Sequence, residues 1–399
     1  MLFILQKSLK SLQARLHEFF WELAGPDGLA VEASALTHAR AKLKASVFVE
    51  LNQTVLQTVY GSDYAGLVKR WRGHRLLGID SSLMRLPSHA AVGEAFGWVQ
   101  CANHRGLQER YPQGRVSALY DVRNEVALDF CLVGGTVAET QLAYGHLRHV
   151  QPGDVLLTDR GYTGYGWLAA VRARGAHFVS RCSQGSFAAV QRLFARNEEN
   201  VSVEVTLQAP RHVRAQCQEQ SWPLELRVRL VTVRLPSGEL EVLATSLLDP
   251  SVYPIEELAA VYWQRWGQET YYGRLKGRWD LEHCSGKTVE AVEQDFAATM
   301  FLSNMESVLI GPAQAQLEAQ TAHRQQPVRV NRAVSVHALK YRLIELLSAS
   351  VPIKQVLEEL TQAFQANPIN ERPGRDVKRR KLSASRSYHY QRRVKKISF

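Results

Sequence analysis

Three acidic residues stand where they could hold a pair of divalent metal ions. Asp80 and Asp159 each follow a short apolar run, residues 76–79 and 155–158, so each ends a predicted buried strand. Glu269 lies in a long helical stretch further along the chain. Carboxylates suit Mg²⁺ or Mn²⁺, and two such ions about 4 Å apart promote attack on a phosphodiester. Any one of these acids alone would equally suit a helix cap or a surface charge.

The acid Glu269 has a distinctive set of neighbours in the sequence. Tyr262, Arg265, Glu269 and Lys276 are spaced by 3, 4 and 7 residues in a stretch without an internal proline. This spacing predicts one α-helix with all four side chains near one face. Such a face presents a metal ligand beside groups that grip phosphate. The plainer interpretation is an i,i+4 salt bridge between Arg265 and Glu269.

The elements around these acids predict an α/β fold. Residues 76–79 form a strand, residues 116–135 a hairpin that turns at Arg123-Asn124, and residues 138–150 a helix. A strand at 155–158, a helix closed by Gly175 and a strand at 176–182 follow. This order matches a ribonuclease H-like catalytic core. Acids at strand ends would converge there, since α/β sites gather at the carboxyl ends of strands.

Changes in hydrophobic pattern and composition along the chain divide it into six predicted segments. Between 184 and 250, three stretches alternate with period two and are separated by prolines, which predicts a β-rich insertion in the core. The remaining flanks are helical. The predicted segments are a helical DNA-recognition region at 1–72, the first part of the core at 73–183, the insertion at 184–250, the second part of the core at 251–300, a C-terminal helical region at 301–369 and a basic tail at 370–399.

Composition narrows the class of protein. The chain of 399 residues is 45% hydrophobic, enough for a large core, and carries a net charge of +11. Residues 370–399 hold eleven Lys and Arg against two acids, so most of the excess lies in this tail. Arg379, Arg380 and Lys381 are candidate DNA-backbone contacts there, although a solvated tail would have the same composition. No apolar run is long enough to span a membrane, and the five scattered cysteines fit a reducing, cytoplasmic compartment.

Several motifs resemble one known family. The pattern Tyr262-x2-Arg265-x3-Glu269-x6-Lys276 resembles the YREK signature of bacterial insertion-sequence DDE transposases of the IS-four family, which includes elements of the Tn-five and Tn-ten type. The segment 159–162, DRGY, resembles the box around the second Asp of that family. Shorter likenesses are GIDSS around Asp80, ASALTHARAKL with Ser34 and Arg40, and VNR at 330–332.

The resemblance implies roles for these residues. Asp80, Asp159 and Glu269 would bind two Mg²⁺ or Mn²⁺ ions, and Tyr262, Arg265 and Lys276 would hold phosphates of the transposon end. Some family members stack a flipped base on tryptophan, a role that Trp266 or Trp222 could take; core packing is the alternative for Trp266. The family's second box also makes Arg160 a candidate DNA contact.

The implied function is a bacterial DNA transposase that works in the cytoplasm at the nucleoid. It would cut at terminal inverted repeats and join the freed 3′-hydroxyl to target DNA, with double-stranded DNA as its partner. The resemblance also implies a homodimer that holds the paired ends. Two alternatives stay open: a ribonuclease H-fold nuclease without strand transfer, and a catalytically silent DNA-binding derivative of a transposase.

Overall fold

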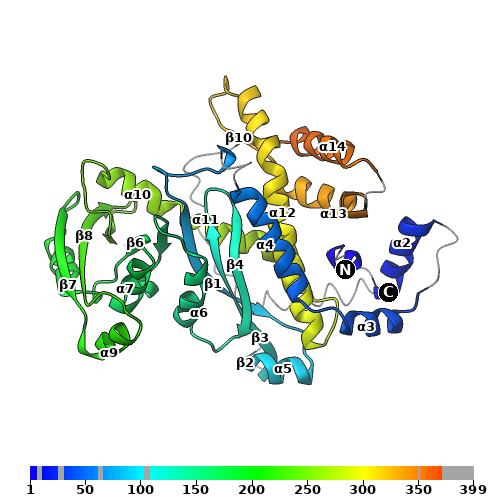
Figure 1. The fold of residues 1–399 in the computed structure, drawn as a ribbon, viewed down its shortest axis with the longest axis horizontal. Helices are drawn as coiled ribbons and strands as arrows, with labels where there is room; N and C mark the ends of the chain where they lie inside the picture. Colours follow the sequence, from blue (N-terminus) through cyan, green and yellow to red (C-terminus); the bar gives the residue numbers. More distant parts are fainter. Residues whose placement is uncertain (7–10, 26–30, 62–65, 103–107, 349–350, 371–399) are drawn as a thin grey trace. The chain divides into compact units, whose positions relative to one another are not determined.

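The computed structural model describes residues 1–6, 11–25, 31–61, 66–102, 108–348 and 351–370 (Figure 1). Its contacts divide the chain into two compact units that interleave along the sequence. The first comprises Met1–Val59, Leu83–Gly114 and Arg274–Phe399, and the second comprises Tyr60–Ser82 and Arg115–Gly273. The six predicted segments are functional divisions and stay predictions. The basic tail, with Arg379, Arg380 and Lys381, lies outside the described residues.

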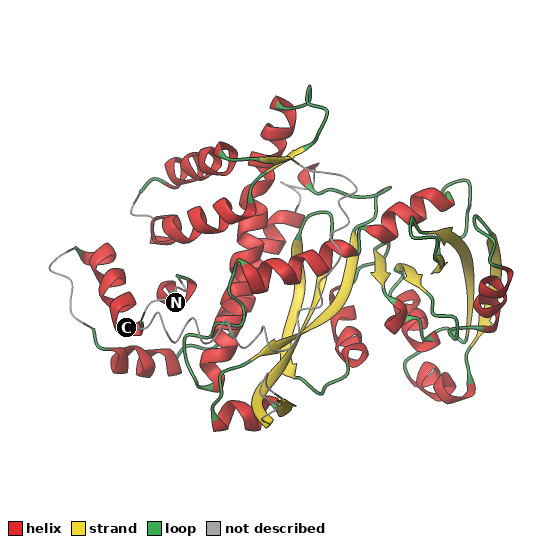
Figure 2. Cartoon of the chain, turned by 180° about the vertical axis from the view of Figure 1, so that it is seen from behind, coloured by secondary structure: helices red, strands yellow, loops and turns green. Residues whose placement is uncertain are grey.

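The second unit is built on a mixed sheet, drawn in yellow in Figure 2. Its strands run in the order β3-β1-β5-β6-β9-β8-β7, and β4 pairs with β3. The strands are β1 (Leu76–Arg85), β3 (Gln108–Asp121), β4 (Val126–Gly134), β5 (Val155–Thr158), β6 (His177–Arg181), β7 (Ser202–Gln208), β8 (Glu225–Arg234) and β9 (Leu240–Thr245). The helices are α6 (Glu139–His146), α7 (Tyr165–Ala173), α8 (Ala188–Arg196), α9 (Arg211–Glu219), α10 (Ile255–Trp263) and α11 (Trp266–Gly277), with the 3₁₀ turns η2 (Leu147–His149) and η3 (Arg160–Tyr162).

Strands β1, β5 and β6 form the parallel centre of this sheet. Leu76 pairs with Val155 and Gly78 with Leu157, and β5 continues the ladder to β6. All seven residues at 76–78 and 155–158 are buried, as expected for parallel strands covered on both faces. The α/β class and the ribonuclease H-like order of elements predicted from the sequence are therefore confirmed.

One strand is longer than the apolar pattern predicted. The sequence placed Asp80 at the end of a strand, but β1 continues to Arg85 and Asp80 lies in its middle. The reason is that β1 also pairs with β3, a strand that contains both polar and apolar residues. A hydrogen bond from Val122 N to Leu76 O marks the start of this antiparallel pairing, so β1 keeps a partner after its ladder with β5 has ended at Gly78.

The predicted β-rich insertion contains its three strands and also two helices. β7 pairs antiparallel with β8, and β8 with β9, while β9 pairs antiparallel with β6 and so extends the central sheet. Helices α8 and α9 lie between these strands in sequence. Period-two alternation found the strands, but each of these helices has only 9 residues, which is shorter than the window in which a helical period is recognised.

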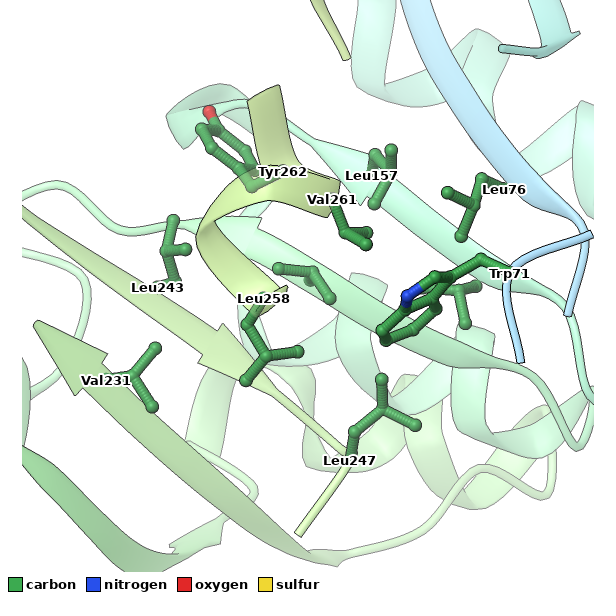
Figure 3. Packing of buried hydrophobic residues seen from close by; sticks show 11 residues of the cluster. Trp71, Leu76, Leu157, Val231, Leu243, Leu247, Leu258, Val261 and Tyr262 are labelled. Carbon is green, nitrogen blue, oxygen red and sulfur yellow. The ribbon is translucent and has the colours of Figure 1, made fainter. Parts of the chain in front are cut away.

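Helix α10 covers one face of the second unit's sheet. Figure 3 shows Leu258 and Val261 of this helix directed toward buried residues of β1, β5, β8 and β9, and Tyr262 belongs to the same buried cluster. Burial of each such side chain stabilises the fold by about 1.5–3 kcal/mol. This packing fixes the end of α10, and hence the segment that leads into α11.

The first unit is organised around a long buried helix, α12 (Val289–Gln320). Helices α1, α3, α5, α13 and α14 all contact α12. None of the described helices of the protein is long and apolar enough to cross a bilayer. The other elements of this unit are α1 (Leu2–Leu5), α2 (Leu12–Ala24), α3 (Ala33–Ala41), α4 (Ser46–Tyr60), α5 (Ala90–Phe96), β2 (Trp98–Ala102), β10 (Val328–Arg329), α13 (Arg332–Ser348), α14 (Ile353–Ala366) and β11 (Ile369–Asn370).

Two arginines from the outlying resemblances anchor helices to α12. Arg40 of α3 pairs with buried Asp295 at 2.5 Å, and Arg332 of α13 pairs with buried Glu306 at 3.3 Å. Removing one member of a buried ion pair leaves the other uncompensated, at a cost of about 3–5 kcal/mol. These arginines therefore position helices within the first unit.

Gly78 tests how α11 docks on the second unit's sheet. A methyl group added to Gly78 would lie 2.5 Å from Oε1 of buried Gln268, whose Nε2 donates to Ala118 O at 2.8 Å. We expect Gly78→Ala to lower the free energy of unfolding by about 1–3 kcal/mol through overpacking, measured by urea denaturation. Gly273→Ala is the control, because a methyl there meets nothing within 4 Å and should stabilise α11 by up to about 1 kcal/mol. Equal effects of the two substitutions would contradict this docking.

His177 makes stability depend on pH. Burial, followed by the charges of Arg172 and His74, lowers its pKa to about 4. The folded state therefore disfavours protonation that the unfolded chain accepts near pH 6.5, so stability is full above pH 6.5 and falls as the pH drops toward 4. We expect His177→Asn to flatten the stability curve over this window in urea titrations. The exposed His212 supplies the control, since His212→Asn should keep the parent slope.

Candidate active site

Asp80 is held in a partly buried position on β1. Its Oδ1 accepts a hydrogen bond from the Ser81 amide at 2.8 Å, and its main-chain carbonyl accepts one from the Tyr272 hydroxyl at 2.7 Å. Burial raises the pKa of Asp80 to about 6, and the carboxylates of Glu139 and Glu269 add to the rise, while the Ser81 amide and Arg265 oppose it. The site thus contains an acid whose charge is incompletely compensated.

Asp159 follows the neighbouring parallel strand β5. It caps the turn η3, where its Oδ1 accepts from the Arg160 amide at 2.8 Å. The Tyr262 hydroxyl reaches the same oxygen at 3.4 Å. β1 and β5 pair in parallel up to Gly78 and Leu157, and Asp80 and Asp159 follow that last pair on their respective chains. The two aspartates therefore lie at the same end of the parallel ladder.

The helix that carries Glu269 is not continuous with the one that carries Tyr262. The sequence predicted one helix for Tyr262, Arg265, Glu269 and Lys276, but α10 ends at Trp263 and α11 begins at Trp266. The 3₁₀-type bond from Arg265 N to Tyr262 O tightens the chain at this break. Gln264 and Arg265 at the break are neither proline nor glycine, and Gly267 lies just inside α11, so local sequence rules did not predict the break.

The positive charge of Arg265 acts on all three predicted metal ligands. Its Nη2 pairs with Glu269 Oε1 at 3.2 Å, which is the salt bridge that the sequence left open as the plainer interpretation. Its charge also acts on Asp80 and Asp159. Burial by itself would lower the pKa of Arg265, but Tyr262, Asp159 and Glu269 raise it. One buried guanidinium is thus the shared counter-charge of the acidic site.

The donor chemistry of this site suits a divalent cation. Asp80, Asp159 and Glu269 offer hard oxygen ligands, and the raised pKa of Asp80 marks a carboxylate that lacks compensating positive charge. The side chains are not arranged as a ready cluster: no three His, Cys, Asp or Glu side chains among the described residues are placed to hold a metal ion. Glu269 is instead directed to Arg265. Their role as metal ligands stays a prediction.

Polar groups next to Asp80 form contacts that the sequence analysis did not predict. Ser81 Oγ donates to Glu139 Oε2 at 2.8 Å and accepts from Arg115 Nη1 at 2.9 Å. The hydroxyl of Tyr162 is buried and has no hydrogen-bond partner among the described residues. Burial and the charges of Glu139 and Asp80 raise the pKa of this tyrosine, so it stays neutral. Only Tyr162 had a sequence signal, as the last residue of the DRGY segment.

Glu241 is a further buried acid near the site. It lies on β9 and pairs with Arg181 Nε at 3.0 Å. Burial raises its pKa, Arg181 and Arg265 lower it, and Asp159 raises it. The only sequence signal was a single glutamate inside an apolar strand pattern, which a surface position would also produce.

The predicted DNA contacts fall into different surroundings. Arg160 and Trp266 are exposed, and the Arg265 guanidinium lies 5.3 Å from the Trp266 ring. Trp222 is half-buried and stacks on Tyr144 with ring centroids 5.5 Å apart, so one of its faces is already occupied.

Lys276 belongs to the first unit by its contacts. It donates to Leu83 O at 2.5 Å and lies 3.6 Å from Glu282. The DNA-contact roles of Lys276 and of the other predicted residues stay predictions.

The fold and site together define a protein with a ribonuclease H-like core and an acidic site at the end of its central parallel strands. The model of the transposase DDE domain family matches residues 71–305, more than half of the chain, so the chain belongs to that family. This confirms the predicted family resemblance at the level of the domain.

Known relatives include the transposase InsG for insertion sequence element IS4 from Escherichia coli strain K12. It is 24% identical over 242 residues, which cover 59% of this chain and 52% of that protein. The chain thus matches about half the length of this relative. Among solved structures, the cryo-EM structure of the piggyBac transposase synaptic complex with hairpin DNA aligns over 86% of this chain and 66% of its own, with 10% identity and a TM-score of 0.42.

The raised pKa of Asp80 predicts a stability cost of its charge. The folded protein holds this proton up to about pH 6, whereas the unfolded chain loses it near 3.8, so ionisation destabilises the fold above pH 6. We expect Asp80→Asn, which keeps the Ser81 contact, to raise the free energy of unfolding at pH 8 by about 1–3 kcal/mol. Urea denaturation at pH 4 should show little difference. An Asn variant that is less stable at pH 8 would contradict this account.

Proposed function

We propose that this protein is a transposase that cuts DNA at terminal inverted repeats and joins the freed 3′-hydroxyl to target DNA. The observation that carries the proposal is the set of three carboxylates from β1, β5 and α11 around one buried guanidinium, Arg265. Membership of the transposase DDE domain family supports it. So does the likeness to InsG, a transposase by its name.

In this proposal Asp80, Asp159 and Glu269 hold two Mg²⁺ or Mn²⁺ ions. When bound, such a pair favours attack on phosphorus and neutralises charge on the leaving oxygen. The protein's own groups then orient the strand. Arg265 would contribute its positive charge beside a phosphate of the strand. Tyr262, hydrogen-bonded to Asp159, would position that carboxylate.

Exposed groups beside the site suit a nucleic-acid strand. Trp263 and Trp266 are 44% and 43% exposed at the α10–α11 break, and exposed aromatic faces stack unpaired bases with little sequence preference. Trp263 was not singled out from the sequence. Arg160, Lys276 and the basic tail would add phosphate contacts. A homodimer would hold two ends together, and this state remains part of the proposal.

Two other functions use the same residues. A nuclease without strand transfer would need the same carboxylates, and a silent derivative would keep the fold alone. Neither has a specific observation in its favour. The buried charge of Asp80 raises the energy of the fold, so retaining it is more easily explained by catalysis than by structure.

The proposal predicts metal-dependent cleavage by the three acids. We expect purified protein with Mg²⁺ to cut DNA that carries the element's terminal repeats. Asp159→Asn and Glu269→Gln should lower the cleavage rate by at least about 100-fold, because each removes a group that stabilises charge in the transition state. The exposed Glu219 of α9 supplies a matched control, since Glu219→Gln should cut at the parent rate.

Products on denaturing gels would separate the candidate functions. Joining of pre-cut ends to a target plasmid identifies a transposase, whereas cleavage without joining identifies a nuclease. Unchanged cleavage by Asp159→Asn would contradict the role of the carboxylates, and DNA binding without any cleavage would favour the silent derivative.

A further inference from the structure

A buried chain of polar groups reaches the back of Asp80. Ser117 Oγ on β3 lies 3.4 Å from the main-chain carbonyl of Asp80 and 3.0 Å from Nε2 of His146. Nδ1 of His146 lies 2.8 Å from Asp129 Oδ2, and Arg148 Nη2 lies 3.1 Å from the same oxygen. The order is therefore Arg148, Asp129, His146, Ser117 and the carbonyl of Asp80.

Burial decides what this serine, histidine and aspartate can do. The order resembles that of a nucleophilic triad, but Ser117, His146 and Asp129 are 0%, 2% and 5% exposed. No substrate atom can approach a hydroxyl that is fully enclosed. Their remaining capacity is to orient the one group of the candidate site that they touch, Asp80. Such supporting contacts fix the orientation of ligands that bind metals.

Counting protons shows how the parts depend on one another. Burial alone would raise the pKa of Asp129, but the contact with His146 and the charges of His149 and Arg148 hold it below its ordinary value. An ionised carboxylate only accepts, so Nδ1 carries a proton. Ser117 has one proton to give. When it donates to the Asp80 carbonyl, Nε2 of His146 must donate to Ser117, which requires the imidazolium form.

The alternative assignment, a neutral His146, has a different consequence for the contact with Asp80. If His146 is neutral, Nε2 accepts the proton of Ser117, and the contact with Asp80 loses its donor. The charged or titratable groups that face His146 are Asp129, Arg148 and His149, with Cys131 beyond Asp129 on β4. Ser117 can therefore hold the Asp80 carbonyl only when Nε2 of His146 donates to it.

We propose that Ser117, His146 and Asp129 form a buried positioning relay that holds the backbone of Asp80 and thereby directs its carboxylate. This rests on the proposed function only where metal binding is concerned. The relay acts from β3, α6 and β4 together, and the Tyr272 hydroxyl holds the same carbonyl from α11. Ser117 and Tyr272, which lie far apart in the sequence, therefore both hold the carbonyl of Asp80.

The test compares Ser117→Ala and His146→Leu with a matched control in the same unit. Thr232→Val serves as the control, because it also removes a fully buried hydroxyl, the one that accepts from Val201 N at 2.9 Å. The first readout is hydrogen exchange of the Ser81 amide, which donates to Asp80 Oδ1. The second is Mn²⁺ affinity of the full chain by calorimetry, without DNA.

Both relay variants should lose protection at Ser81 and bind Mn²⁺ about 10-fold more weakly. The control should change neither, even at equal loss of stability. His146→Gln keeps an amide donor toward Ser117, so it should retain both Mn²⁺ affinity and Ser81 protection, a rescue that a merely structural role would not produce. It also carries the test if Ser117→Ala fails to fold.

Relay variants that match Thr232→Val in Ser81 exchange would overturn the relay. If the parent binds no Mn²⁺ and cuts no DNA while Ser81 protection still depends on Ser117, the proposed function fails and the relay stands as a positioning device. The two failures are therefore distinguishable.

Discussion

Placing three like charges in a partly buried site is unfavourable unless positive charge compensates them, and this constraint shapes the second unit. Arg265 supplies that charge from inside the protein. Arg265 lies in the break between α10 and α11, and its guanidinium pairs with Glu269. The compensation is incomplete, as the raised pKa of Asp80 shows. A site built this way is suited to cations.

Rigid supports hold these charges in place. The ladder between β1 and β5 sets the two aspartates side by side, and α11 approaches so closely that a methyl group at position 78 would clash with Gln268. Packing of α10 on the sheet fixes the start of the break (Figure 3). Hydrogen bonds to the Asp80 carbonyl then reach it from Tyr272 and Ser117. Each contact restricts the backbone and thereby fixes the positions of the charged side chains more precisely.

The first unit uses the same physical means for a different purpose. Arg40 and Arg332 each neutralise a buried acid of α12, so buried ion pairs there define how helices assemble. Each of these acids has its own arginine, whereas Asp80, Asp159 and Glu269 share the charge of Arg265. This difference in compensation separates a structural use of buried charge from the candidate catalytic use.

The sequence by itself determined the order of strands and helices, the family, and the acids worth testing. Apolar runs and turn residues report local structure. Tyr262, Arg265 and Glu269 still interact with one another in the candidate site, although the single helix predicted for them is broken. Tertiary structure alone decided that break, the length of β1, the short helices of the insertion and the polar groups behind Asp80. Those features depend on contacts between residues far apart in the chain, such as Asp80 with Tyr272 or Gly78 with Gln268. Local patterns carry no record of such contacts.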